Sequence, residues 1–307
     1  MCGIVGYIGK EQAAGFLLDG MSKLEYRGYD SAGIAVYDKG KIDIEKCVGR
    51  LDALRQKLSG HMPTGSVGIG HTRWATHGRP NDINAHPHCD DSGEFVVVHN
   101  GIIENYMSLK NDLIAKGHTF VSETDTEVVA HLLADYYDGD FEEAVKKVLS
   151  IIEGSYSLVF MCAKEPDKLI CTKKSNPLVI GLGEGENFIA SDIPAIIAKT
   201  RRTFIMSDGE IATVTKDKVW VQDIKGTPIA KKVFEVNWNA EAAEKGGFEH
   251  FMLKEIYEQP KAVRDTLTGR LDKDGQGVTF NELNWTADEF KGINKIFIVA
   301  CGTAYHA

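Results

Sequence analysis

The sequence predicts an α+β protein in which stacked sheets are flanked by helices. Two observations lead to this fold class: short β-rich runs fall into two blocks along the chain, and amphipathic helices lie between the blocks. At 307 residues the chain also exceeds the length of about 150 residues expected for one domain. We therefore expect about two structural units.

The first block begins with a strand over residues 2–8, followed directly by a helix. Apolar residues at 14, 17, 18, 21 and 24 recur at helical spacing and lead toward Gly28. Several of the runs that follow are bounded by glycine or Asp-Lys-Gly turns. Further strands of this block are predicted at 33–37, 41–45, 66–70 and 95–98.

Three helices and a second block of strands complete this part. One helix is predicted at about 104–116, ending before Gly117, the next starts near Asp125, and the third covers about 140–152. The second block of strands is predicted at 156–162, 168–171, 177–182, 187–190, 203–206, 210–215 and 218–222.

The last part of the chain predicts a second domain. Residues 224–249 are polar, so we place the first domain at 1–239 and the second at 240–307. Residues 251–267 predict a helix interrupted at Pro260, and 296–300 predict an apolar strand that leads into Cys301-Gly302-Thr303. A parallel α/β domain begins in this way, with a phosphate-binding loop at the strand's end. Because one strand cannot make a sheet, we expect the chain to be a fragment of a longer protein.

Composition narrows the function classes. A net charge of −9 with dispersed basic residues disfavours nucleic acid or an anionic membrane surface as the main partner. No apolar run approaches membrane-spanning length, and the six cysteines form no close pairs, so neither a zinc ribbon nor a disulfide framework is indicated. We expect a cytoplasmic protein.

Cys2 is a candidate N-terminal nucleophile. If Met1 is removed, one residue carries both a thiol and a free α-amine that can act as its base. The amine titrates near pH ~7.7–8.0 and the thiol near ~8.5, so a proton passes between them at little cost. The alternative is that Cys2 is a small buried residue of the first strand.

A polar cluster with five histidines allows two interpretations. It comprises His71-Thr72-Arg73-Trp74-Ala75-Thr76-His77-Gly78, His86-Pro87-His88 and His99-Asn100-Gly101. A metal site is disfavoured because no carboxylate or cysteine stands at helical ligand spacing. The other interpretation is a pocket in which Arg73 grips a carboxylate and Thr76 and His77 add donors.

Two further segments carry candidate site residues. Asn100-Gly101 follows an apolar run and can supply a side-chain amide and a backbone N–H to an oxyanion, or make a tight turn. Residues 122–127 indicate a helix N-terminus, where Asp125 can also bind a ligand ammonium.

Five motifs together resemble the glutamine–fructose-6-phosphate aminotransferase (isomerizing) family. They are Cys2-Gly3-Ile4-Val5-Gly6, Tyr26-Arg27-Gly28-Tyr29-Asp30-Ser31-Ala32-Gly33, His71–Gly78, His99–Asn105 and Glu123–Glu127. The resemblance implies a four-layer αββα glutaminase domain of the N-terminal nucleophile type, followed by the start of a sugar-phosphate isomerase domain.

The resemblance also implies the role of each residue. Cys2 attacks the glutamine amide, and Asn100 with the Gly101 N–H forms the oxyanion hole. Arg73, Thr76 and His77 hold the α-carboxylate, and Asp125 holds the α-ammonium. Trp74 gates an ammonia channel. Cys301, Gly302 and Thr303 begin the fructose 6-phosphate loop, although Ala304 stands where many members have a phosphate-binding serine.

The implied parent makes glucosamine 6-phosphate and glutamate from fructose 6-phosphate and glutamine, as a homodimer and without a metal or nucleotide cofactor. The 307-residue chain should retain only the glutaminase half. Two alternatives stay open: a non-catalytic glutamine-binding module, if Met1 stays attached, and a histidine-metal hydrolase built on His71, His77, His86, His88 and His99.

Overall fold

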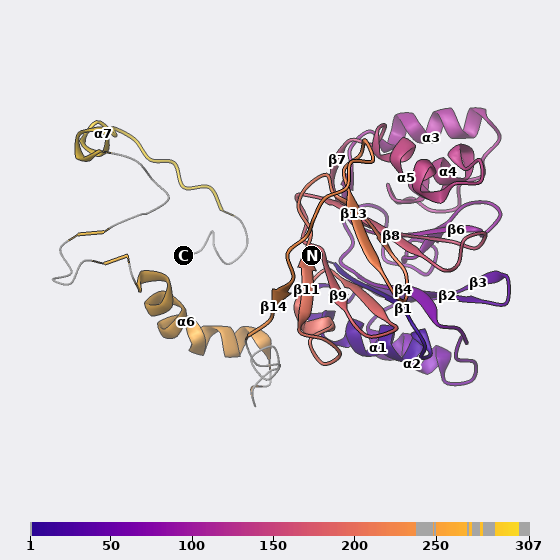
Figure 1. Ribbon diagram of the computed structural model, residues 1–307, viewed down its shortest axis with the longest axis horizontal. Helices are drawn as coiled ribbons and strands as arrows, with labels where there is room; N and C mark the ends of the chain where they lie inside the picture. Colours follow the sequence, from indigo (N-terminus) through magenta and orange to yellow (C-terminus); the bar gives the residue numbers. More distant parts are fainter. Residues whose placement is uncertain are drawn as a thin grey trace. The chain divides into compact units, whose positions relative to one another are not determined.

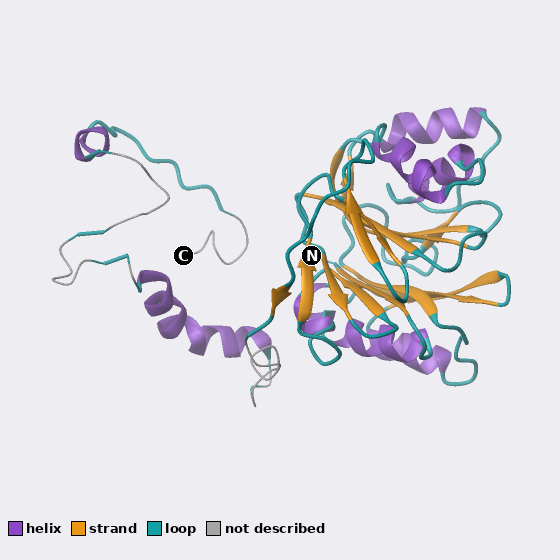
Figure 2. Ribbon diagram, viewed as in Figure 1, coloured by secondary structure: helices purple, strands orange, loops and turns teal. Residues whose placement is uncertain are grey.

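A computed structural model describes residues 2–237, 248, 250–268, 270–271, 277–278 and 286–300. The chain divides into two compact units, Met1–Glu244 and Lys245–Ala307. The first unit is a sandwich of four layers, helix, sheet, sheet and helix (Figures 1 and 2). The predicted α+β class and the αββα arrangement are therefore confirmed.

An eight-stranded and a six-stranded sheet form the two inner layers, and neighbouring strands pair antiparallel. In spatial order, the larger sheet contains β14 (Phe234–Glu235), β11 (Arg202–Ile205), β9 (Val179–Leu182), β10 (Asn187–Ala190), β1 (Gly3–Ile8), β4 (Val67–Arg73), β2 (Ser31–Asp38) and β3 (Lys41–Val48). The smaller sheet contains β13 (Val219–Gln222), β12 (Ile211–Val214), β8 (Leu169–Lys174), β7 (Gly154–Cys162), β6 (Phe95–Ile103) and β5 (His88–Cys89).

Helices cover the outer face of each sheet (Figure 1). The helices α1 (Ala13–Ser22) and α2 (Leu51–Leu58) pack on the larger sheet. The helices α3 (Tyr106–Ala115), α4 (Glu127–Tyr136) and α5 (Phe141–Leu149) pack on the smaller one. Short 3-10 turns occupy Glu25–Arg27 and Ile193–Ala195.

The alternation of side chains along β6 explains why the sheets stack. Val96 and Val98 belong to the apolar core between the sheets, whereas Phe95 and Val97 belong to the core beneath the helices. Successive residues of a strand point to opposite faces, so a strand that is apolar at every position is buried on both sides. The central strands are therefore buried on both faces. The apolar residues of β6 hold the strand in place, and with it the polar residues at its end.

Most predicted elements are confirmed, with boundaries shifted by a few residues. The helix α2 and the short strands β5 and β14 were not predicted. The sequence of α2 has an apolar stripe, Leu51, Leu54 and Leu58, which is buried in the core between the larger sheet and its helices. It was a readable signal for a helix.

Lys46 connects the edge strand β3 to the segment that precedes β5. Its Nζ donates hydrogen bonds to the carbonyl oxygens of Ile83, Ala85 and Pro87 at 3.0, 2.8 and 3.2 Å. Burial lowers the pKa of this ammonium group. Residues 83–87 therefore fold around one charged side chain.

The second unit contains α6 (Phe251–Leu267) and α7 (Ala287–Lys291). Two predictions are wrong here. The helix α6 continues through Pro260, because a proline removes one helical hydrogen bond and does not always end the helix. Residues 296–300 form no strand, and Ile298 is 91% exposed, since a strand needs a partner to pair with.

The predicted phosphate-loop residues Cys301, Gly302 and Thr303 lie outside the described residues. None of the helices in the described ranges has both the length and the apolar composition needed to cross a membrane.

Candidate functional site

A cavity of about 260 Å³ opens where the start of β1, the end of β4 and the end of β6 meet. It brings together seven of the predicted site residues. They are Cys2, Arg73, Trp74, Thr76, Asn100, Gly101 and Asp125. Cys2 comes from one sheet and Asn100 from the other, so the stacking of the two sheets forms the site.

The Cys2 thiol lies against the backbone of Trp74. The Trp74 N–H donates to Sγ at 3.1 Å, and the thiol lies 3.4 Å from the Trp74 carbonyl oxygen. Pairing of Gly3 with Thr72 between β1 and β4 sets this position. Burial raises the pKa of the Cys2 thiol, and the Trp74 hydrogen bond and the Arg73 charge oppose that rise. A neutral resting thiol needs a base before it can attack.

The amide of Asn100 is held in one orientation by His71. His71 Nε2 lies 3.0 Å from Asn100 Oδ1 and 2.9 Å from the His99 carbonyl oxygen. Since both neighbours are acceptors, Nε2 carries the proton. Burial lowers the pKa of His71 to about 3, so the ring is neutral. The Asn100 NH₂ group therefore faces Cys2, whose carbonyl oxygen it contacts at 3.0 Å.

Gly101 occupies a backbone conformation that favours glycine. Its φ is +132°, and a Cβ atom would lie 2.0 Å from the Ser155 carbonyl oxygen. Asn176 Nδ2 donates to the Asn100 carbonyl oxygen at 3.1 Å, which fixes the peptide between Asn100 and Gly101. The Gly101 N–H is thus pre-oriented, as an oxyanion donor must be.

Arg73 is 3% exposed, and part of its guanidinium group is unused. Nη2 donates to the carbonyl oxygens of His77 and, at 3.3 Å, Gly78. Nη1 is buried and has no hydrogen-bond partner among the described residues. A buried, unpartnered donor on a cation is costly, and an incoming carboxylate would remove that cost.

Asp125 supplies a negative charge to the same cavity. It is 4% exposed, and its Oδ2 accepts a hydrogen bond from the Ile103 N–H at 2.8 Å. His99 Nδ1 is 3.8 Å from that oxygen, but burial lowers the pKa of His99, so the imidazole does not neutralise the carboxylate. A cavity with Arg73 and Asp125 suits a zwitterion.

The segment 28–30 clamps the loop that carries Arg73 and Trp74. The Asp30 carboxylate accepts from the Ala75 N–H at 2.9 Å, and the Asp30 N–H donates to the Arg73 carbonyl oxygen at 2.9 Å. A Cβ atom on Gly28 would lie 2.7 Å from the Arg73 carbonyl carbon. Reasoning from these residues alone had given this motif no role.

The remaining predicted residues differ in position. The side chain of His77 is absent from the residues that line the cavity, and its ring packs edge-on against Tyr106 with centroids 5.8 Å apart. Thr76 lines the cavity, with Oγ1 3.4 Å from His77 Nδ1. Trp74 is 45% exposed and packs edge-on against Tyr29 at 5.4 Å.

The other histidines form a buried framework around hydroxyl groups. Thr126 Oγ1 lies 2.9 Å from both His86 Nε2 and His99 Nδ1, and Thr124 Oγ1 lies 3.1 Å from His88 Nε2. Burial lowers the pKa of each of these histidines. Neutral imidazoles bonded to hydroxyl groups favour the polar-pocket interpretation of the cluster.

Sequence reasoning missed several lining residues that come from distant segments. They are Ser155, Asn176 and Pro177, whereas the other lining residues stand in the motifs that the sequence analysis had singled out. The Asn-Pro pair is a turn signal in sequence, but only the fold brings that turn beside Asn100.

Comparisons with known proteins find a matching domain family and similar curated proteins. A family model described as "Glutamine amidotransferase domain" matches residues 71–198. The chain is 57% identical to a glutamine–fructose-6-phosphate aminotransferase (isomerizing) of Caldanaerobacter subterraneus and 53% identical to one of Clostridium tetani, in each case over 100% of this chain and 50% of the relative. Over its whole length the chain is thus similar to members of the glutamine–fructose-6-phosphate aminotransferase family, and residues 71–198 match a glutamine amidotransferase domain.

The chain spans about half the length of the curated relatives that it matches. Among solved structures it is similar to the glutamine phosphoribosylpyrophosphate amidotransferase of B. subtilis, with a TM-score of 0.64 and 27% identity over 73% of this chain and 49% of that one. The matched region of the family model begins at His71 and includes Arg73, Asn100 and Asp125.

Proposed function

We propose that the first unit hydrolyses the side-chain amide of glutamine through a thioester on Cys2. The observation that carries this proposal is the placement of the Cys2 thiol and the fixed Asn100 amide in one cavity with Arg73 and Asp125, where the Asn100 NH₂ group contacts the Cys2 carbonyl oxygen. A nucleophile, an oxyanion donor and two opposite charges are the parts that this reaction needs.

Nucleophilic attack requires removal of Met1. The free α-amine of Cys2 then takes the thiol proton, and Sγ forms a bond to Cδ of glutamine. The C–N bond breaks, and ammonia leaves with a proton returned by the amine. Water then attacks the thioester, the C–S bond breaks, and glutamate and the thiol are released.

The developing oxyanion would be bound by the Asn100 NH₂ group and the Gly101 N–H. His71 and Asn176 hold these donors before substrate arrives, so no reorganisation is needed during reaction. Such fixed donors stabilise a transition state more than water does.

Substrate orientation would come from the charged residues. Arg73 would bind the α-carboxylate of glutamine through Nη1, and Asp125 would bind the α-ammonium group. We assign Thr76 to the carboxylate as well. We assign His77 an indirect role in binding the carboxylate. Its carbonyl oxygen accepts a hydrogen bond from Arg73, while its ring packs against Tyr106.

The whole protein would deliver ammonia to fructose 6-phosphate to form glucosamine 6-phosphate. In this proposal residues 1–239 are the glutaminase domain, 240–307 begin a sugar-phosphate isomerase domain, and Cys301, Gly302 and Thr303 contribute to its phosphate loop. Trp74 gates the ammonia path. We further propose a homodimer for the full-length protein, no metal or nucleotide cofactor for this reaction, and a cytoplasmic location.

The test follows glutamate and ammonia release from glutamine, together with the intact mass of the protein. Protein that lacks Met1 should turn over and show a γ-glutamyl adduct when quenched with acid. Incubation of the 307-residue chain with glutamine and fructose 6-phosphate should give glutamate without amino sugar. Turnover by protein whose mass retains Met1 would refute the mechanism.

A non-catalytic glutamine-binding module is the second candidate. The unused Arg73 donor and the Asp125 charge favour binding even where catalysis is absent. Saturable glutamine binding without glutamate release, by protein shown to lack Met1, would establish this alternative. Release of glutamate would exclude it.

A further inference from the structure

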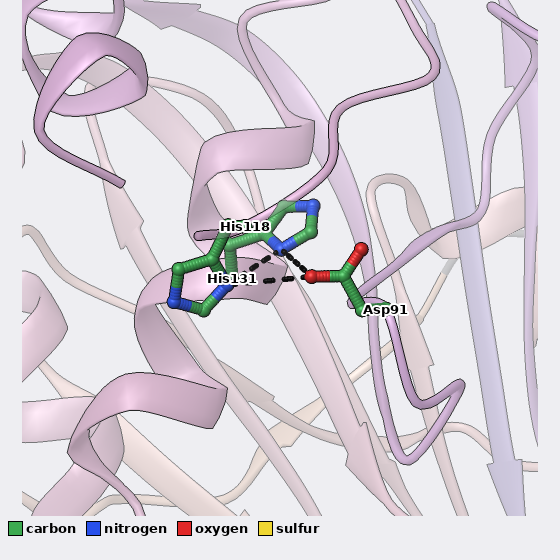
Figure 3. Close-up of side chains that lie close together, drawn as sticks. All are labelled: Asp91, His118 and His131. Carbon is green, nitrogen blue, oxygen red and sulfur yellow. Dashed lines mark hydrogen bonds and ion pairs between the residues drawn. The ribbon is translucent and has the colours of Figure 1, made fainter. Parts of the chain in front are cut away.

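Asp91, His118 and His131 meet on the smaller sheet's helical side, away from the residues that line the cavity (Figure 3). Asp91 follows β5, His118 follows α3 and His131 lies within α4. His118 Nδ1 is 3.1 Å from His131 Nδ1, and Asp91 Oδ2 is 3.6 and 3.7 Å from these two nitrogens. Within the described ranges, no other group of three potential ligands is this close.

These distances match the edges of a tetrahedral metal site. Zinc binds imidazole nitrogen and carboxylate oxygen at about 2.0–2.2 Å, and neighbouring ligands of a tetrahedron are then about 3.3–3.6 Å apart. The three distances between Asp91, His118 and His131 average close to that value. A cation between the three atoms needs only small side-chain shifts.

The outer nitrogens of both histidines face carboxylates. His118 Nε2 is 3.3 Å from Asp135 Oδ1, and His131 Nε2 is 3.8 Å from Glu127 Oε1. The Asp135 acceptor favours a proton on His118 Nε2, and the nearby Glu127 charge favours one on His131 Nε2, which has no hydrogen-bond partner among the described residues. With these tautomers both Nδ1 atoms present lone pairs. Two lone pairs 3.1 Å apart repel each other unless a proton or a metal ion lies between them. A carboxylate behind each metal-binding histidine is the usual arrangement of a zinc site.

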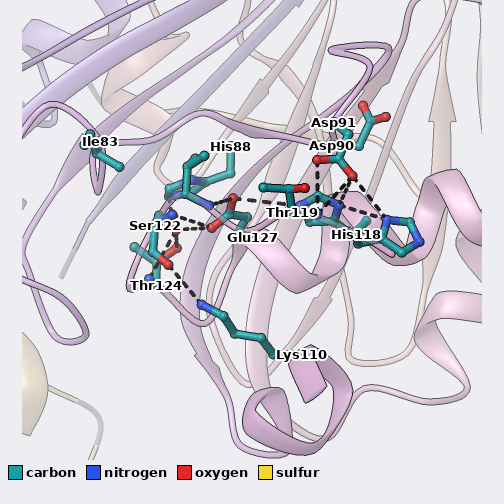
Figure 4. Close-up of polar contacts among 12 residues, drawn as sticks. Ile83, His88, Asp90, Asp91, Lys110, His118, Thr119, Ser122, Thr124 and Glu127 are labelled. Atoms are coloured by element: carbon teal, nitrogen blue, oxygen red, sulfur yellow. Dashed lines mark hydrogen bonds and ion pairs between the residues drawn. The ribbon is translucent and has the colours of Figure 1, made fainter. Parts of the chain in front are cut away.

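The three ligands are also held in place by their surroundings. Both carboxylate oxygens of Asp91 lie 3.2 Å from the Thr119 N–H. The His131 ring is 1% exposed and packs on Phe120 with centroids 4.3 Å apart. Glu127 accepts hydrogen bonds from the Ser122 N–H and hydroxyl group at 2.7 and 2.6 Å (Figure 4). The ligands are therefore pre-organised.

We propose that Asp91, His118 and His131 form a Zn²⁺ site with an open fourth position for water. Two imidazoles and one carboxylate favour zinc over Mg²⁺ or Ca²⁺, which prefer all-oxygen ligands. The ion would tie the segment after β5 and the α3–α4 connection to α4. It would thus stabilise the helix that follows Asp125, without contact with the reacting atoms.

The experiment measures Zn²⁺ uptake by the chelator-treated, purified 307-residue chain, using calorimetry and elemental analysis. All proteins in the series carry Cys2→Ala, because a thiol beside a free α-amine binds zinc itself. We expect one equivalent of Zn²⁺ and a thermal midpoint that rises by several degrees, with no response to Mg²⁺.

Three variants and one control locate the ion. Asp91→Asn and His118→Ala should each weaken Zn²⁺ binding about 100-fold or more, and Asp135→Asn about 10-fold. His61→Ala is the matched control, since the His61 side chain is 79% exposed and lies 3.7 Å from the carboxylate of Asp43. Circular dichroism should show that all variants fold.

The proposal is overturned if the parent binds no Zn²⁺, or binds it as tightly in folded Asp91→Asn and His118→Ala as in His61→Ala. Either result would mean that a shared proton holds the two histidines together. Neither result depends on glutamine hydrolysis, so this site and the proposed function fail or stand separately.

Discussion

The two halves of the cavity are built in different ways. The half that holds Cys2 and Asn100 joins the two sheets, with Cys2 directly before β1 and Asn100 within β6, and the buried neutral His71 orients the amide. The half that holds Arg73 and Asp125 lies at the end of β4 and just before α4, where backbone hydrogen bonds and the Asp30 contacts hold the chain in place. The core thus fixes the reacting groups, and local contacts fix the charges that bind substrate.

This difference separates turnover from affinity. If the assignment is right, changes at Cys2 or Asn100 should lower kcat, and changes at Arg73 or Asp125 should raise KM. The three kinetic experiments that follow can each break that division, and a fourth tests the buried histidines that surround the cavity.

The largest effect is expected for Cys2→Ala. Loss of the nucleophile should reduce glutamine turnover by at least about 10⁴-fold, while glutamine still binds because Arg73 and Asp125 remain. Calorimetry of glutamine binding beside an ammonia assay measures both quantities. Cys2→Ser serves as the conservative comparison and should retain little activity. Full turnover by Cys2→Ala would remove the central claim.

Asn100→Ala should have the next largest effect, a loss of about 10²–10³ in kcat with little change in KM. The removed NH₂ group contacts the Cys2 carbonyl and is positioned for the oxyanion. Steady-state kinetics of glutamate release measure the effect. Asn111→Ala, an exposed position on α3, is the control. If Asn100→Ala raised KM alone, the oxyanion role would be wrong.

Arg73→Ala and Asp125→Asn should raise KM for glutamine about 10- to 100-fold and alter kcat less, because each removes one charged partner of the zwitterion. Arg55→Ala, whose exposed ion pair with Asp19 spans 3.2 Å, should leave both constants unchanged. An unchanged KM in Arg73→Ala would end the division between the two halves.

The last prediction concerns the stability of the fold, which should depend on pH through the buried histidines and affect activity least. Burial lowers the pKa of His71 to about 3 and also lowers that of His88, so the unfolded chain binds more protons below its histidine pKa of about 6.5. This contribution to stability is complete above pH ~6.5 and is lost as pH falls toward ~3, by at most about 1.4 kcal/mol per pH unit for each histidine.

Urea unfolding between pH 7 and pH 5 measures that slope. His88→Gln removes one buried imidazole outside the cavity lining and should make the slope shallower, whereas the exposed His61→Gln should not. A slope equal in all three proteins would show that buried neutral histidines do not set the acid stability.

The sequence was sufficient to locate the helices and strands that have strong local patterns of apolar residues. Alternating or continuous apolar runs located β1 and β6, and helical spacing located α1, α4 and α5. Residues 296–300 were wrongly predicted as a strand, because strand formation depends on a partner that local composition does not reveal.

Site residues could be predicted where the residue type itself suggests the chemistry. They could not be predicted where the role depends on which residues the fold brings together. A second-position cysteine and an arginine in a polar segment carry their chemistry with them. Asn176 holds the Asn100 peptide from 76 positions away, and no local pattern links the two. The position of His77 against Tyr106 is likewise a tertiary result.

Lys46 links an outermost strand to the cavity. Its ammonium group binds the carbonyl oxygens of Ile83, Ala85 and Pro87, and this segment contains His86, which lines the cavity. A sheet edge normally tolerates substitution well. On β3, therefore, tolerance to substitution should be interrupted at Lys46.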